Sequence, residues 1–97
     1  MNFSYHSFSI PSISPLNFKP VYHVRDSPIF LIGLKNDGTM YENLNIKFTI
    51  LNLGVSSQVA NVRLGPKTSV LKQLITYIPQ TAKPGKFLFV ANREFLP

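Results

Sequence analysis

The clearest pattern in the chain is an alternation of apolar and polar positions near its middle. From residue 44 to residue 50 every second side chain is apolar, and the residues between them are Asn, Lys and Thr. This period of two predicts a strand with one buried and one solvated face. Residues 60–64 alternate in the same way, and the stretch Asn52-Leu53-Gly54 between the two runs favours a turn. The two runs therefore predict a hairpin or near-hairpin.

Two further apolar runs predict strands on either side of this hairpin. Ile29–Leu34 is rich in strand-forming residues, and Asn36-Asp37-Gly38 after it is a turn sequence, because Asp and Gly tolerate positive φ. Phe87–Ala91 is apolar at every position, which is typical of a strand covered on both faces. Asn92–Glu94 then predicts a tight turn.

The apolar rhythm changes after Gly65-Pro66, and residues 70–78 predict a helix. Thr68 or Ser69 can cap its first turn, and Pro79 ends it. The apolar residues there fall at helical spacing on one stripe: Val70, Leu71, Leu74, Ile75 and Ile78. A strand is the alternative, since every second residue from Leu71 to Tyr77 also alternates. Leu74 and Ile78 interrupt that alternation, so we expect the helix.

The N-terminal residues 1–28 predict an extended arm in front of one small domain at residues 29–97. This arm is rich in Ser and aromatic residues and is interrupted by four prolines, which remove ladder donors and restrain their predecessors to extended geometry. Its shortage of acids and wealth of Ser leave open an organelle-targeting segment. The chain lacks Cys and any apolar run near the ~20 residues that span a bilayer, and residues 1–25 show no basic segment followed by an apolar one, so we expect no secretory signal. We therefore expect a cytoplasmic protein without a transmembrane segment.

The chemistry-bearing residues do not predict an enzyme. There is no Cys, and the four carboxylates stand at spacings that pair none of them on one face. His6 lies in the arm, and His23, three residues before Asp26, is most simply an exposed histidine. Two histidines without nearby Cys or acid clusters do not make a metal site. We expect no catalytic residues, no cofactor and no metal.

Charge is distributed unevenly along the chain. The net charge is +6, and six of the ten Lys and Arg residues lie in residues 61–97 with one of the four carboxylates. A one-sided basic field favours nucleic acid, anionic lipid or an acidic protein face, although the same charges can also serve as a solvated face. Candidate basic partner-binding residues are Arg63, Lys67, Lys72, Lys83, Lys86 and Arg93, with Phe87 and Phe89 as aromatic candidates that could stack on single-stranded nucleic acid.

The expected order strand–strand–helix–strand from residue 45 onward resembles the opening of the β-grasp, or ubiquitin-like, fold. Asn45–Leu53 and Gln58–Leu64 stand as its hairpin, and 68–75 stands where the family begins its helix. The segment 87–97, with its Asn turn and Phe-Leu-Pro end, most resembles the twelve-type modifiers of autophagy. The family's last strand and its conjugating C-terminal Gly have no counterpart here. The resemblance therefore implies a non-conjugating form that binds partners.

A second resemblance leads to a different fold. The two alternating runs around Asn52-Leu53-Gly54 are similar to immunoglobulin-like sandwich domains, which would make residues 70–78 a strand and the chain all-β. We expect an α+β domain with a β-grasp-like core, with an all-β sandwich or a β-rich dimer as alternatives. The expected function is a non-enzymatic interaction module that binds a protein partner through a sheet edge or groove. The alternative is a basic viral or accessory protein that binds nucleic acid or an anionic surface and can form a homodimer.

Overall fold

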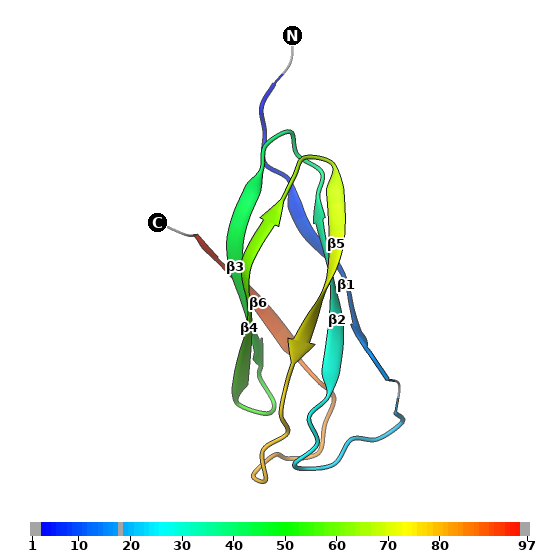
Figure 1. Cartoon of the computed structure of the whole chain (residues 1–97). Coiled ribbons are helices and arrows are strands. Elements are labelled where there is room, and N and C mark those ends of the chain that lie inside the picture. The colour runs from blue at the N-terminus through cyan, green and yellow to red at the C-terminus, as the bar shows by residue number, and fades with distance from the viewer. Residues whose placement is uncertain (1–2, 18, 96–97) are drawn as a thin grey trace.

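The chain folds into a sandwich of two antiparallel three-stranded sheets, shown in Figure 1. The structure is a computed structural model and describes residues 3–17 and 19–95. Six strands lie in this part of the chain: β1 (Phe8–Pro15), β2 (Ile29–Asn36), β3 (Glu42–Ile50), β4 (Val55–Leu64), β5 (Thr68–Ile75) and β6 (Phe89–Phe95). The hairpin expected at 44–64 is confirmed, since β3 and β4 pair antiparallel across the turn at Asn52–Gly54.

Each sheet has a central strand flanked by two edge strands. The first sheet has the order β1-β2-β5, and the second has the order β4-β3-β6. β1 and β6 lie on one side of the sandwich, where Phe8 and Arg93 are in contact. β4 and β5 lie on the other, where Ser57 reaches Ile75. We call these the β1–β6 side and the β4–β5 side.

The core lies between the sheets and is built from alternate residues of the central strands. β2 contributes Phe30, Ile32 and Leu34, and β3 contributes every second residue from Leu44 to Phe48. The edge strands complete it with Val59, Val62 and Leu74. Because successive side chains in a strand point to opposite faces, the period of two in the sequence is the direct cause of this arrangement.

The expected helix at residues 70–78 is wrong. Thr68–Ile75 is the strand β5, which pairs with β2 in continuous register from Ile29↔Ile75 to Asn36↔Thr68. The Thr68 hydroxyl donates to the Gly65 carbonyl in the preceding turn and does not cap a helix. The apolar residues of the expected stripe are divided between two faces, since Leu74 is buried whereas Leu71 and Ile75 are 63% and 64% exposed. An in-register partner strand therefore outweighs the local helical spacing.

The expected α+β fold with a β-grasp-like core is wrong as a consequence. No helix lies in residues 3–17 and 19–95, and the stated alternative, an all-β sandwich, describes the architecture. Two details near the C-terminus also differ from expectation. Residues 92–94, expected as a turn, lie inside β6, and the strand is not covered on both faces because Val90 is exposed. The apolar run at 87–91 reflects packing at the end of the sandwich and not a doubly buried strand.

The N-terminal stretch interpreted as an arm contributes an edge strand to the first sheet. Phe8–Pro15 forms β1 beside β2, with a register shift between Ser9 and Ser12. The residues before β1 continue along the turn at 37–39, where Thr39 donates its amide to the Tyr5 carbonyl. A side chain at Gly38 would lie 2.5 Å from that carbonyl oxygen, so the close approach of the two backbones requires glycine.

Asn36 ties together the turns at the end of the sandwich that is uppermost in Figure 1. Its side chain is fully buried, and its amide nitrogen donates to the carbonyls of Met40, Leu64 and Gly65. Its side-chain oxygen accepts the Gly38 amide. One buried amide therefore satisfies the backbone of two turns that are far apart in the sequence, as burial of polar groups demands.

Candidate functional site

The outward edge of β5 presents backbone groups that could pair with another strand. Thr76 donates its amide to the Pro28 carbonyl, and hydrogen-bonding direction alternates along an antiparallel pair. The even-numbered residues of β5 therefore direct their amides and carbonyls towards β2, and the odd-numbered ones direct theirs outward. The Ile75 carbonyl confirms this, because it accepts a bond from the Ser57 hydroxyl of β4 at 2.7 Å. Within the described residues no strand pairs with this edge of β5, which we call the open edge.

Apolar side chains stand above the open edge on the outer face of the first sheet. Leu71 and Ile75 are the two most exposed, and they lie opposite Gly33 and Ile29 of β2. Leu31, opposite Gln73, is partly exposed on the same face. An edge strand with apolar residues on its accessible face combines unpaired backbone groups with surface that gains from being covered.

The other three edge strands, β1, β4 and β6, carry features that hinder pairing, and in β6 these are the adjacent charged residues Arg93 and Glu94. β1 contains Pro11 and Pro15 and a register shift. β4 has a register shift opposite Asn45, where Asn61 takes a positive φ of 56° and donates its amide to the Asn45 side chain. β5 has no proline, glycine or register shift, and Lys72 is its one charged residue. Among these strands, β5 is the one best suited to accept a partner strand.

The basic residues identified in the sequence do not converge on one surface. Arg63 lies 4.7 Å from the Tyr41 ring centroid, and Lys67 donates to the Tyr5 hydroxyl and the Asp37 carbonyl at the same end of the sandwich. Lys72 is exposed in the middle of β5, whereas Lys83 and Lys86 lie in the loop at the opposite end. Arg93 on β6 pairs with the buried Glu42. Their common position in the sequence therefore does not create a common face.

The two aromatic candidates pack inward. Phe87 and Phe89 both meet the buried Phe30 edge to face, with ring centroids 5.4 Å and 4.9 Å apart. Tyr22 adds a further edge-to-face contact to Phe87. These rings are engaged in the packing of the loop end, so their faces are not arranged as a stacking platform for bases.

A charged cluster that the sequence did not predict lies on the β1–β6 side. The Glu42 carboxylate is 2% exposed and contacts His6 Nδ1 at 2.7 Å and the Arg93 guanidinium. The Arg93 guanidinium also lies 5.4 Å from the Phe8 ring. These residues come from three distant segments, and no local pattern connects them. The cluster joins the chain before β1, the strand β3 and the strand β6.

Comparison of the chain with protein-family models, curated proteins and solved structures finds no match. In the described ranges there is no helix that could cross a membrane. No group of three or more His, Asp or Glu residues in the same part of the chain could hold a metal ion. The fold defines the class of the protein as a small antiparallel β-sandwich, and the open edge of β5 is its candidate functional site.

Proposed function

We propose that this domain is a non-enzymatic interaction module that binds a protein partner by adding an extended strand of that partner to the open edge of β5. The supporting observation is the outward direction of the backbone groups of Ser69, Leu71, Gln73 and Ile75, beneath exposed apolar side chains. In strand addition, main-chain hydrogen bonds supply affinity and alternate side chains supply specificity. The open edge of β5 offers the main-chain groups, and its outer face offers the side-chain contacts.

Apolar contact on the outer face complements the backbone pairing. A partner strand beside β5 would place alternate side chains next to Leu71 and Ile75, which are exposed over nearly two thirds of their area. Covering such side chains contributes about 25 cal/mol per Å² of apolar surface. Lys72 is the one charge on the strand, so an unlike charge on the partner strand beside it would add to recognition.

The test begins by selecting binders for the purified chain from a displayed library of ~10-residue peptides. Backbone amide NMR shifts on titration should be concentrated at residues 69–77 and 29–33. The double variant Leu71→Ser and Ile75→Ser should lower affinity at least about tenfold, because two apolar contacts are lost. A matched control, Leu51→Ser and Leu88→Ser, removes two leucines of similar exposure elsewhere and should leave affinity within about twofold.

Three results would contradict the proposal. Shifts concentrated away from β5 and β2 would place the site elsewhere. Equal losses in both double variants would mean that the binding is not specific to this face. The third result is a mass that doubles at high concentration in the original chain and does not double in the Leu71→Ser and Ile75→Ser variant. It would mean that the open edge binds a second copy of the chain and not a separate partner.

A further inference from the structure

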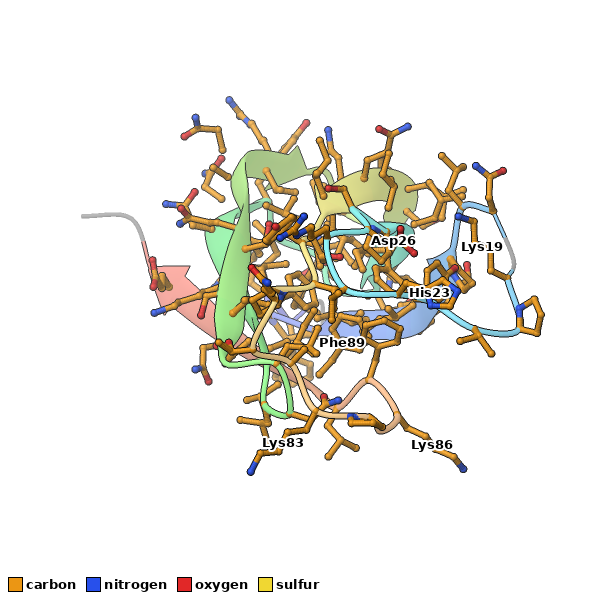
Figure 2. The ribbon with its side chains drawn as sticks, turned by 90° about the horizontal axis from the view of Figure 1, so that it is seen from below. Lys19, His23, Asp26, Lys83, Lys86 and Phe89 are labelled. Atoms are coloured by element: carbon orange, nitrogen blue, oxygen red, sulfur yellow. The ribbon has the colours of Figure 1, made fainter. Side chains whose placement is uncertain are left out.

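A second surface lies at the loop end of the sandwich, away from the open edge of β5. Segments 19–24, 52–53 and 82–87 enclose a hollow of about 690 Å³, which we call the loop-end basin. Figure 2 looks onto this end of the molecule. The volume falls within the range of ligand-binding pockets, roughly 300–1,000 Å³. The basin therefore has the size of a binding site.

The lining of the basin is mainly apolar. Val21 and Val24, which are 61% and 45% exposed, line it together with Leu53 and Ile78. The ring of Phe87 closes the inner end against Tyr22. Partly exposed valines in a concave surface gain from being covered by an apolar group. The lining thus favours a ligand with at least one large apolar side chain.

The rim of the basin is cationic. Lys19, Lys83 and Lys86 line it together with His23, and all four side chains are exposed. The neighbouring carboxylate, Asp26, accepts the backbone amide of His23 at 2.8 Å. In Figure 2, Lys83 and Lys86 point outward at the two sides of their loop, and Lys19 lies on the separate 19–24 segment. Positive charge is therefore spread around the apolar lining and does not converge on one point.

This combination of charge and apolar surface selects the class of ligand. Cations that are spread around a hollow complement an extended chain with several negative charges better than one compact anion. A nucleic acid would also need ring faces for base stacking, but Tyr22 and Phe87 are packed against each other edge to face, and Lys19 Nζ lies 5.9 Å from the Tyr22 ring centroid. We infer that the loop-end basin binds an acidic peptide segment of a protein partner, with one large apolar side chain of that segment inserted among Val21, Val24 and Leu53. This inference does not depend on strand addition to β5.

Fluorescence anisotropy of a labelled peptide tests the inference. The probe is a twelve-residue peptide of Asp, Glu, Ser and Gly with one central Phe, titrated with the full chain. We expect a dissociation constant below about 1 mM that rises with salt, because the rim charges are exposed. Replacing the Phe of the peptide by Ser, or its acids by Lys, should weaken binding at least about tenfold.

Variants of the chain separate the basin from general attraction to a basic protein. Lys83→Glu with Lys86→Glu should weaken binding at least about tenfold, and Lys83→Gln with Lys86→Gln should do so less strongly. Val21→Ser with Val24→Ser should weaken binding about fivefold at unchanged charge. The control, Lys35→Glu with Lys47→Glu, makes the same change in net charge at exposed positions outside the basin. It should leave the affinity within about threefold.

Thermal melting of each variant by circular dichroism verifies that the sandwich is intact. Absence of binding at 1 mM protein would overturn the inference. An equal loss in the Lys35 and Lys47 control would overturn it as well, since the attraction would then be nonspecific. Tighter binding of a twelve-residue oligothymidylate than of the acidic peptide would replace it with nucleic-acid binding. None of these outcomes changes the expected results at β5, which lies on a different surface.

Discussion

The two sides of the sandwich are closed in different ways. On the β1–β6 side, the buried Glu42 carboxylate holds His6 from the chain before β1 and Arg93 from β6. On the β4–β5 side, the Ser57 hydroxyl donates to the Ile75 carbonyl. One side is therefore fastened by side chains from three segments around a buried carboxylate, and on the other no strand of the described residues pairs with the edge of β5.

The same difference is visible in the two strands that flank β2. β1 is interrupted by Pro11 and Pro15 and shifts register, whereas β5 runs in register with β2 over its whole length. Proteins commonly protect edges by such prolines and irregularities, because an unprotected edge pairs with other chains. The first sheet is therefore protected at its β1 edge, whereas its β5 edge carries no proline or register shift, which supports β5 as the interaction edge.

The largest expected effect comes from proline placed at two neighbouring positions of β5. Lys72→Pro removes an amide that faces β2, so the Ile32 carbonyl opposite it loses its hydrogen-bond donor. We expect the free energy of unfolding to fall by about 2–3 kcal/mol. Gln73→Pro removes an amide that faces the open edge, and should cost about 1 kcal/mol or less. Urea denaturation followed by circular dichroism measures both.

The pair of proline variants is its own control, because the two positions are adjacent and both side chains are exposed. Equal losses of stability would mean that the alternation of inward and outward backbone groups along β5 has been assigned wrongly. Gln73→Pro should also abolish strand addition while the fold remains, since proline cannot donate to a partner strand. A partner that binds this variant as well as the original chain would contradict pairing at the open edge.

A smaller effect is expected on the β1–β6 side from Glu42→Gln. The change removes the charge that Arg93 and His6 share, and bonds to charged groups contribute about 1.5–3 kcal/mol. We expect a loss of about 2 kcal/mol and a melting temperature lower by roughly 10 °C. Glu94→Gln, at an exposed carboxylate, should change stability by less than about 0.5 kcal/mol. Similar losses in both variants would show that burial of Glu42 is not what closes this side.

The sequence predicted those parts of the fold that depend on neighbouring residues. The strand expected at 29–34 follows from a run of strand-forming residues, and the strand at 44–50 with its hairpin to β4 follows from period-two patterns and turn residues. At β5 the pattern favours a helix over the strand, which was the alternative, because both faces of β5 carry apolar residues. Leu74 faces the core and Leu71 and Ile75 face solvent, and together they imitate a helical stripe. The exposed apolar face that makes β5 a candidate site is therefore also the reason why the pattern predicts a helix there.

The contacts that distinguish the two sides could not be predicted from local patterns. His6 lies 36 residues before Glu42, and Arg93 lies 51 residues after it. Nothing in the sequence near any of these residues specifies the other two, because the fold brings them together only when β1, β3 and β6 meet on one side. The same is true of the loop-end basin, whose walls come from segments 19–24, 52–53 and 82–87.

The smallest expected effect tests how far the β1–β6 side depends on its outermost contact. His6→Ala leaves Arg93 on Glu42 and removes only a half-exposed partner, so global stability should fall by about 1 kcal/mol or less. The local effect should be clearer, because the Asp37 amide donates to the Ser7 carbonyl beside His6. Its hydrogen exchange should accelerate about threefold to fivefold, while His23→Ala at the other end leaves it unchanged. Unaltered exchange at Asp37 in the His6 variant would mean that Glu42 and Arg93 alone close this side, and that the chain before β1 is held by its backbone bonds to the turn at 37–39.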